Sequence, residues 1–416
     1  MSLVVQKYGG SSLADADRIR HVAARIAAER ERGSDLVVVV SAMGDTTDDL
    51  LALAARVTDE PDPRELDVLL ATGEHMSGTL VAMALHARGL AAISLTGAQA
   101  GIRTDPSHGR ARIANVEPAR IQQEIERGRV VIVAGFQGVT DESTLSGEVT
   151  TLGRSGSDTT AVALAARLDA ERCEVYTDVE GIFTADPRVV PDARLLSSIS
   201  YEEMLELAGQ GAQVMQVRAV ELGWVNGVEI AVRSTFSDHP GTLIRQEDDV
   251  EQRNKVRGLA SDRNVAKLTL LAVPDRPGVA RTVFTPLADA GINVDMIVQN
   301  VSHAGTTDLS FTVHTTDLTR AQRTLEPVVA ELGAQGLAAD AGVAKVSIVG
   351  AGIKSTPGYA ARMFGALADN GINIEMISMS DIRITCIIAE DQLEEAARAL
   401  HAAFQLEQPE SVADAG

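Results

Sequence analysis

The sequence predicts an α/β protein in which a domain built on a mostly parallel β-sheet is followed by two smaller α+β units. Short apolar runs such as "DLVVVV" and "RVVIVAGF" alternate with helical stretches through the first 245 residues. Strands of that composition are typical of a parallel sheet covered by helices on both faces. The C-terminal third contains an internal repeat, because "LADAGINVDMI" (residues 287–297) recurs as "LADNGINIEMI" (residues 367–377).

The first domain, residues 1–245, is predicted to start with a strand at Leu3–Gln6, a double glycine and a helix over Arg18–Arg30. Segments rich in Gly, Ser, Thr and Asp follow most of the later strands. Ligands of parallel sheets bind beyond the carboxyl ends of the strands, so we expect the functional site at that edge. The later strands are predicted at Asp35–Met43, Ala91–Leu95, Arg129–Phe136 and Cys173–Asp178.

A charged stretch without periodicity, residues 239–255, ends this domain and leads us to place a linker at residues 246–262. Two repeat units are expected after it, at residues 263–340 and 341–416. Each unit is predicted as a strand, a Pro-Gly turn, a helix, a Gly-Ile-Asn turn and a second strand. A structural duplication without any ligand is the alternative interpretation.

Composition argues against several classes of protein. The formal charge of −21 repels phosphate backbones, so no nucleic acid partner is expected. Cys173 and Cys386 lie far apart in apolar stretches, which favours reduced cysteines over a disulfide framework. The apolar run at the N-terminus is too short for a signal peptide. No apolar run approaches the ~20 residues of a membrane helix, and the histidines lack paired ligand spacing. We therefore expect a cytoplasmic protein without a membrane partner or a protein metal site.

Four strand-to-helix segments carry candidate chemistry. In "QKYGGSS" (residues 6–12), the glycines would let the backbone approach a phosphate, and Lys7 would add a point charge. An ordinary turn is the alternative, since the Gly-Lys of a Walker A loop is missing. "VSAMGDTT" (residues 40–47) offers Ser41 and Thr47, with Asp45 as a possible helix cap. "ATGEHMSG" (residues 71–78) places Glu74 at an expected turn, as an ammonium ligand or simply as an exposed carboxylate.

The fourth segment, "TTLGRSGSDTTA" (residues 150–161), combines a polar loop with the start of an apolar helix. Arg154 presents a planar fork suited to a carboxylate. A simple helix N-cap is the alternative interpretation of Asp158, and it is compatible with a second role. Further along, "YTDVEGIFTADPR" (residues 176–188) ends a strand and turns, in a way that could hold ribose and adenine with Arg188 near a phosphate.

Taken in order, these motifs resemble the aspartate kinases, a branch of the amino acid kinase family, over nearly the whole chain. The doubled C-terminal unit resembles tandem ACT domains. The resemblance implies a three-layer α-β-α kinase domain followed by two ferredoxin-like ACT domains. It also implies transfer of the γ-phosphoryl group of MgATP to the side-chain carboxylate of L-aspartate. The product, 4-phospho-L-aspartate, leads toward lysine, threonine and methionine.

The resemblance also implies residue roles. Lys7 and Asp158 would be catalytic, and Mg²⁺ would be held mainly by ATP oxygens and water. The substrate would contact Ser41, Thr47, Glu74, Arg154 and Ser157. ATP would contact Lys7, Tyr8, Gly9, Gly10, Thr177, Asp178, Phe183 and Arg188. The chain departs from the usual pattern at Phe183, where Tyr is common, and at Ser155-Gly156, where Gly-Gly is common.

For the ACT units, the resemblance implies feedback inhibition by lysine, threonine or both, and a homo-oligomer, possibly with a shorter ACT-only subunit. Turn and cap residues are the alternative reading of each effector candidate. The rival functions are another amino acid kinase, acting on glutamate, acetylglutamate or a nucleotide, and a non-catalytic amino-acid sensor. The effector candidates are Asp275, Asn293, Val294, Asp295, Gln299, Ser355, Asn373, Ile374 and Glu375.

Overall fold

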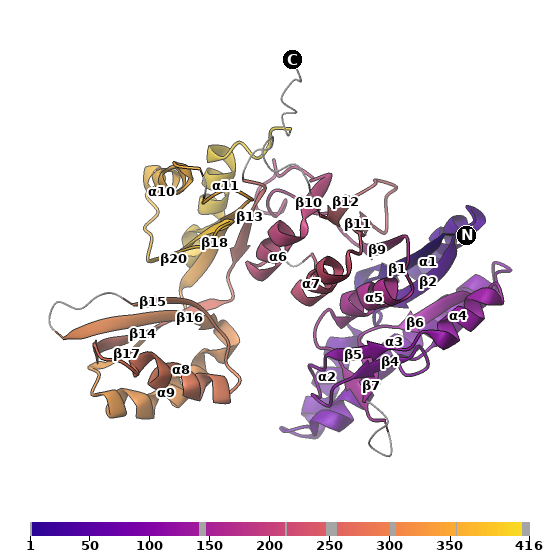
Figure 1. Ribbon diagram of the computed structural model, residues 1–416, viewed down its shortest axis with the longest axis horizontal. Coiled ribbons are helices and arrows are strands. Elements are labelled where there is room, and N and C mark those ends of the chain that lie inside the picture. The colour runs from indigo at the N-terminus through magenta and orange to yellow at the C-terminus, as the bar shows by residue number, and fades with distance from the viewer. Residues whose placement is uncertain are drawn as a thin grey trace. The chain divides into compact units, whose positions relative to one another are not determined.

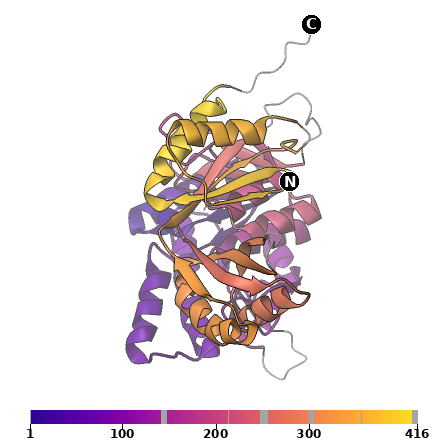
Figure 2. The same ribbon diagram turned by 90° about the vertical axis from the view of Figure 1, so that its left-hand side faces the viewer.

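The structure is a computed structural model that describes residues 2–140, 147–212, 214–246, 256–299, 305–354 and 356–409. It divides into two compact units, each of which is a folded body in its own right (Figures 1 and 2). The first unit contains Met1–Ile182, Leu195–Ala208 and Gln213–Asp248. The second contains Phe183–Arg194, Gly209–Ala212 and Asp249–Gly416.

The first unit is built on a sheet of eight strands in the order β10-β12-β11-β9-β1-β2-β6-β3. Neighbouring strands are parallel except for the β11–β12 pair, which confirms the predicted mostly parallel sheet. The strands are β1 (Leu3–Tyr8), β2 (Asp35–Val40), β3 (Ala92–Leu95), β6 (Val130–Ala134), β9 (Arg172–Thr177), β10 (Ser198–Ser200), β11 (Ile230–Ser234) and β12 (Thr242–Arg245).

Helices cover both faces of this sheet because alternate residues of each strand point to opposite faces. On one face, α1 (Ala16–Glu31) and α3 (Pro63–His86) share an apolar core with β1, β2 and β6. On the other face, α5 (Gly156–Arg167) packs against β1, β2 and β9, and α7 (Val217–Asn226) packs against α5. The unit is completed by α2 (Thr46–Val57), α4 (Ala119–Glu126) and α6 (Tyr201–Gly209).

A small second sheet in the same unit was not predicted from the sequence. Its order is β5-β4-β7-β8, formed by β4 (Ile102–Thr104), β5 (Ile113–Val116), β7 (Gln137–Thr140) and β8 (Val149–Thr151). Strand β8 leads directly into the loop before α5. This sheet therefore sets the starting point of the loop that carries Arg154.

Helix α3 is the one helix of the described part of the chain that is long and apolar enough to cross a membrane by length and composition. Half of its apolar window is buried inside the protein. Its buried positions include the carboxylates Asp67 and Glu74. Those features are typical of the core helix of a globular domain.

The second unit contains two four-stranded antiparallel sheets, each covered by two helices, and the repeat pattern of strand, turn, helix and strand is confirmed. The first repeat comprises β14 (Val265–Pro274), α8 (Val279–Asp289), β15 (Val294–Gln299), β16 (Thr306–His314), η2 (Thr315–Asp317), α9 (Leu318–Leu332) and β17 (Gly336–Asp340). The second comprises β18 (Val343–Val349), α10 (Tyr359–Asp369), β19 (Met376–Met379), β20 (Arg383–Ala389), η3 (Glu390–Gln392) and α11 (Leu393–Ala403).

Up to residue 409, where the described part of the chain ends, the second repeat forms no final strand of its own, and β13 (Gly258–Asp262) takes that place beside β18. The corresponding place in the first repeat, beside β14, is filled by β17. An unpaired β18 would leave a row of free backbone groups at the sheet edge, which β13 pairs. The structure therefore differs from the expected linker at residues 246–262, since residues 258–262 form a strand. Residues 247–255 lie outside the described part of the chain.

The segment Phe183–Arg194 also differs from the expected boundaries, because it belongs to the second unit although it lies within residues 1–245. Ala185 and Val190 are buried in the core of the second repeat. The hydroxyl of Thr184 lies 3.0 Å from Nε2 of the buried His401. Burial of these side chains against the repeat explains the assignment, and this contact between distant segments has no local signature in the sequence.

Candidate active site

The loops that follow β1 and β2 pack tightly against each other at the carboxyl edge of the main sheet. A Cβ atom on Gly10 would lie 2.9 Å from the carbonyl oxygen of Ala42, so glycine is needed at this close approach. The backbone N–H of Gly44 donates to the carbonyl oxygen of Gly10 at 3.0 Å. The short helix η1 (Gly10–Leu13) begins at the same point. This packing brings the Lys7–Gly10 and Ser41–Thr47 segments together.

Lys7 lies in β1 and points to the face covered by α5. Its Nζ lies 2.7 Å from Oδ1 of Asp158, and both side chains are buried. The interpretation of Asp158 as the helix N-cap was wrong, because Ser155, in the left-handed region, holds that position. Asp158 is the third residue of α5, where its charge also complements the helix N-terminus. The pair therefore holds a compact cation at the carboxyl end of β1.

Glu74 lies inside α3 and not at a turn, which corrects the prediction from "ATGEHMSG". Gly73 serves close packing there, because a Cβ on it would lie 2.8 Å from the Cβ of Ala42. Glu74 is 3% exposed, and its Oε1 accepts a hydrogen bond from the backbone N–H of Ala42 at 3.1 Å. Its Oε2 has no hydrogen-bond partner among the described residues. Burial raises the pKa of Glu74 to about 7, against the opposing effect of that backbone bond.

Arg154 lies in the exposed loop between β8 and α5. Its Nη2 lies 3.3 Å from Oδ1 of Asp48, in the first turn of α2 next to Thr47. The Arg154 side chain is 90% exposed, so this ion pair is weak and the guanidinium can exchange Asp48 for a ligand carboxylate. Asp45 occupies the N-cap position of α2, as suggested, but its side chain makes no cap hydrogen bond.

The remaining candidates divide between the two units. Ser157 packs so closely on the end of β6 that a Cβ on Gly135 would lie 2.8 Å from its Oγ. Thr177 ends β9, next to β1, and its hydroxyl donates to Oδ1 of Asp178 at 3.1 Å. Phe183 and Arg188 belong to the second unit, where Arg188 pairs with Asp186 at 2.7 Å.

Sequence reasoning missed three polar residues of this region: Asp67, Gln216 and Arg218. Asp67 lies seven residues, about two helical turns, before Glu74 on α3, so both carboxylates share one face. Its carboxylate lies 3.0 Å from His108 Nδ1 and accepts hydrogen bonds from the backbone N–H groups of Gly109 and Thr151 and from the Thr151 hydroxyl. The spacing of the two carboxylates becomes a signal only once the segment is recognised as a helix. Gln216 and Arg218 had no sequence signal.

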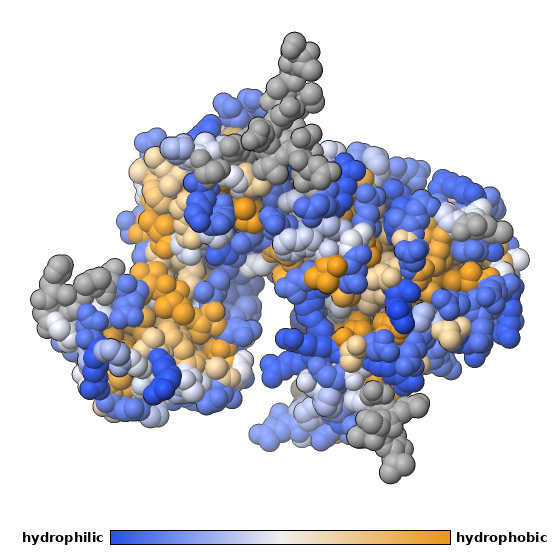
Figure 3. Space-filling model, viewed as in Figure 1, coloured by the Kyte–Doolittle hydropathy of each residue, from blue (hydrophilic) through white to orange (hydrophobic). Residues whose placement is uncertain are grey.

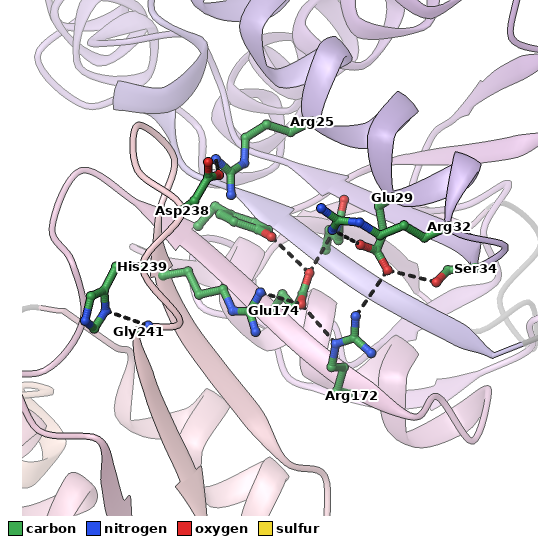
Figure 4. Close-up of polar contacts among 12 residues, drawn as sticks. Arg25, Glu29, Arg32, Ser34, Arg172, Glu174, Asp238, His239 and Gly241 are labelled. Carbon is green, nitrogen blue, oxygen red and sulfur yellow. Dashed lines mark hydrogen bonds and ion pairs between the residues drawn. The ribbon is translucent and has the colours of Figure 1, made fainter.

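The opposite face of the same strands carries a different cluster, centred on Glu174 (Figure 4). Its carboxylate, 1% exposed, accepts hydrogen bonds from Gln6, Arg172 and Tyr176 and forms an ion pair with Arg233 at 3.2 Å. Burial acts to raise the pKa of Glu174, but Arg233 and the donors outweigh burial and lower it. Both oxygens of this carboxylate have hydrogen-bond or ion-pair partners within the protein, so we interpret the cluster as one that stabilises the fold.

In the second unit, two effector candidates already have partners. Lys345 of the second repeat donates to Asp295 of the first at 2.7 Å, and Lys267 of the first repeat donates to Glu375 of the second. The two pairs are related by the repeat. Asp275, Asn293, Gln299 and Asn373 are exposed, Val294 and Ile374 are partly buried, and Ser355 lies outside the described residues.

Comparison with known proteins identifies the family of this chain. Residues 2–234 match the amino acid kinase family, and residues 268–332 and 346–404 match ACT domains. The chain is 51% identical to the aspartokinase of Mycolicibacterium smegmatis over 98% of this chain and 97% of that protein. This chain belongs to the amino acid kinase family, among the aspartokinases. It is accordingly an ATP-dependent kinase with a carboxyl group as acceptor.

Solved aspartokinase structures confirm the fold. E. coli aspartokinase III in complex with aspartate and ADP matches with a TM-score of 0.80 and 27% identity, over 96% of this chain and 99% of that one. The same E. coli enzyme in complex with lysine and aspartate matches with a TM-score of 0.74 and 27% identity, over 97% and 99%. The two are described as R-state and T-state, so the E. coli enzyme exists in two states.

Proposed function

We propose that the protein transfers the γ-phosphoryl group of MgATP to the side-chain carboxylate of L-aspartate. The product is 4-phospho-L-aspartate, and the reaction is the first step toward lysine, threonine and methionine. The observation that carries this proposal is Glu74, a buried carboxylate with one oxygen unpaired among the described residues. Such a group is costly unless a cation binds to it, and the ammonium group of an amino acid supplies that cation.

The other residues of the edge suit the two remaining charges of aspartate. Arg154 offers a planar, exposed guanidinium for the α-carboxylate. The side-chain carboxylate, with an ordinary pKa near ~3.9, is already ionised and needs no general base. The barrier is the approach of one anion to another, which Lys7 and the amide of Gly10 reduce by contacting the phosphates. The N–H of Gly9 already donates to the carbonyl oxygen of Tyr176 at 3.2 Å. Asp158 holds the Lys7 ammonium in place at 2.7 Å.

Ser41, directly after β2, Thr47, in the first turn of α2, and Ser157, in the first turn of α5, would contact the substrate or the transferring phosphate. Thr177 and Asp178, at the end of β9, would line the nucleotide site, to which Tyr8 would contribute only its backbone because its side chain is buried against Tyr176. The described residues include no group of three or more His, Cys, Asp or Glu side chains suited to a metal. Mg²⁺ would be bound mainly through phosphate oxygens and water, where it would offset phosphate charge.

We further propose that lysine, threonine or both inhibit the enzyme through the ACT repeats, which would pair between chains in a homo-oligomer, possibly with a shorter ACT-only subunit. The lysine found with E. coli aspartokinase III supports this. Apolar side chains on the edge strands β15 and β19 are exposed, namely Ile297, Ile377 and Met379, and Figure 3 shows apolar surface on both ACT parts. The expected effector contacts are the remaining candidates plus Asp295 and Glu375, whose lysine partners the effector would displace.

The direct test is aspartate-dependent release of ADP from MgATP, with hydroxylamine to trap the acyl phosphate as a hydroxamate. We expect hydroxamate with L-aspartate and less of it when lysine plus threonine are added. Hydroxamate that the two amino acids do not reduce would contradict the regulatory half alone. The alternative candidate is another carboxylate-phosphorylating amino acid kinase, and hydroxamate with glutamate or acetylglutamate but not with aspartate would favour it.

A further inference from the structure

The loop that carries Arg154 is held through its own backbone by the start of α7. Gln216 Nε2 donates to the carbonyl oxygen of Arg154 at 2.9 Å. Two residues later, Arg218 Nη1 donates to the carbonyl oxygen of Leu152 at 2.8 Å, and its Nη2 donates to that of Ala111 at 2.9 Å. Two carbonyl groups on either side of Gly153 are therefore fixed from one helix terminus.

Gln216 occupies the N-cap position of α7, yet its side chain makes no cap hydrogen bond there. Ser, Thr, Asp and Asn are preferred at that position, and glutamine is not. The amide oxygen instead accepts a hydrogen bond from the hydroxyl of Thr159, a buried residue of α5 next to Asp158. An amide side chain can donate and accept at once, so Gln216 links the Arg154 loop to the helix that holds Lys7.

The other contacts near Arg154 are local or exposed. The N–H groups of Gly156 and Asp158 donate to the carbonyl oxygens of Gly153 and Ser155 at 3.0 and 3.2 Å, and the Arg154 guanidinium pairs with Asp48, whose side chain is 63% exposed. Ser155 lies at a φ of 55°, in the left-handed region that glycine prefers. A backbone that turns in this way needs contacts from outside to hold one direction. The hydrogen bond from Gln216 is such a contact.

We propose that Gln216 is a positioning residue that aims Arg154 at the α-carboxylate of the amino-acid substrate, with Thr159 as its brace. The inference rests on the proposed function, because it takes the α-carboxylate as the ligand of Arg154. In addition to chain continuity, the Gln216 amide connects the backbone of the Arg154 loop to α5, the helix that carries Asp158. Gln216 therefore governs substrate discrimination, while Lys7 acts on the phosphoryl group.

The test compares L-aspartate with its α-amide, which keeps the ammonium group and the side-chain carboxylate but lacks the α-carboxylate charge. Arg154→Met is expected to lower kcat/KM for L-aspartate and to leave the α-amide nearly unchanged. Gln216→Met should raise the KM for L-aspartate about 5- to 10-fold, as loss of one hydrogen bond predicts. It should leave the KM for ATP unchanged, and Thr159→Val should give a smaller change in the same direction.

The double variant decides whether Gln216 acts through Arg154. Added to Arg154→Met, Gln216→Met is expected to have no further effect on L-aspartate. The proposal would be overturned by an additive effect in the double variant, or by equal losses with L-aspartate and its α-amide in Gln216→Met. It would also be overturned if Arg154→Met still preferred L-aspartate over the α-amide as strongly as the unaltered protein does. If the unaltered protein turns over neither substrate, the proposed function fails instead. In that case, the rate of tryptic cleavage after Arg154 without substrate still measures how firmly Gln216 holds the loop. An unchanged cleavage rate in Gln216→Met would overturn the proposed positioning role.

Discussion

Glu74 and Glu174 are two buried glutamates of the same unit whose surroundings give opposite results. Glu174 is surrounded by arginine, glutamine and tyrosine donors, and its pKa is lowered despite burial. Among the described residues, the Glu74 carboxylate accepts one hydrogen bond, from the backbone N–H of Ala42, and burial raises its pKa to about 7. The difference lies in the supply of partners and not in depth. A buried carboxylate whose partners are all internal stabilises the fold, whereas one that lacks a partner is available to a ligand.

The largest expected effect comes from breaking the saturated cluster. Glu174→Leu should lower the free energy of unfolding by about 3–5 kcal/mol, because Arg172 and Arg233 would lose their shared buried partner. Urea denaturation measures this. Glu171→Gln is the matched control, since Glu171 also pairs with Arg172 but is 54% exposed, and it should cost less than about 1 kcal/mol. Equal losses from both variants would contradict the structural role of the buried position.

The next effect concerns Glu74, where stability and activity should separate. Glu74→Gln is expected to cost about 2–4 kcal/mol in binding of L-aspartate, a fall of roughly 30- to 1,000-fold in kcat/KM. The unfolding midpoint should stay the same or rise, since a buried charge without an internal partner is removed. Nucleotide binding is the control and should be unchanged. If the variant unfolds more easily yet binds aspartate normally, Glu74 has a structural role like that of Glu174 and is not a substrate ligand.

The pKa of Glu74 also predicts a pH dependence. Only the carboxylate form binds an ammonium group, so kcat/KM for L-aspartate should rise up to tenfold per pH unit below pH 7 and level off above it. The same raised pKa favours the protonated folded state, so the contribution of Glu74 to stability is present at low pH and is lost as pH rises through about 7. Both trends should disappear in Glu74→Gln, and their persistence there would assign them to another group.

The comparison also explains what the sequence could predict. Lys7, Arg154 and Asp158 were found because each lies beside glycines and hydroxyl residues in a segment that connects a predicted strand to a predicted helix. Glu74 was found as a ligand candidate but placed on a turn, because Gly73 and Gly78 suggested a break. The structure shows that Gly73 allows α3 to approach the β2 loop.

Other features depend on contacts between distant segments, which no local pattern records. Asp67 and Gln216 act on backbone groups 84 and 62 residues away in the chain. Strand β13 precedes the first repeat but pairs with the second, and the segment Phe183–Arg194 joins the core of the second unit. Backbone partners leave no residue-type signature, so periodicity and motif spacing could not place any of them.

The smallest expected effect extends the comparison to the ACT repeats. Asp295 and Glu375 resemble Glu174, in that an internal lysine already occupies each carboxylate. Lys345→Met removes the partner of Asp295 and makes it resemble Glu74, open to the ammonium group of an effector. Asp295 is 43% exposed, so the pair contributes at most about 1 kcal/mol, and the lysine concentration for half-inhibition should fall by up to about fivefold. Lys267→Met should act in the same way through Glu375, and a rise in that concentration in either variant would show that the lysine pair supports the effector site instead of competing for it.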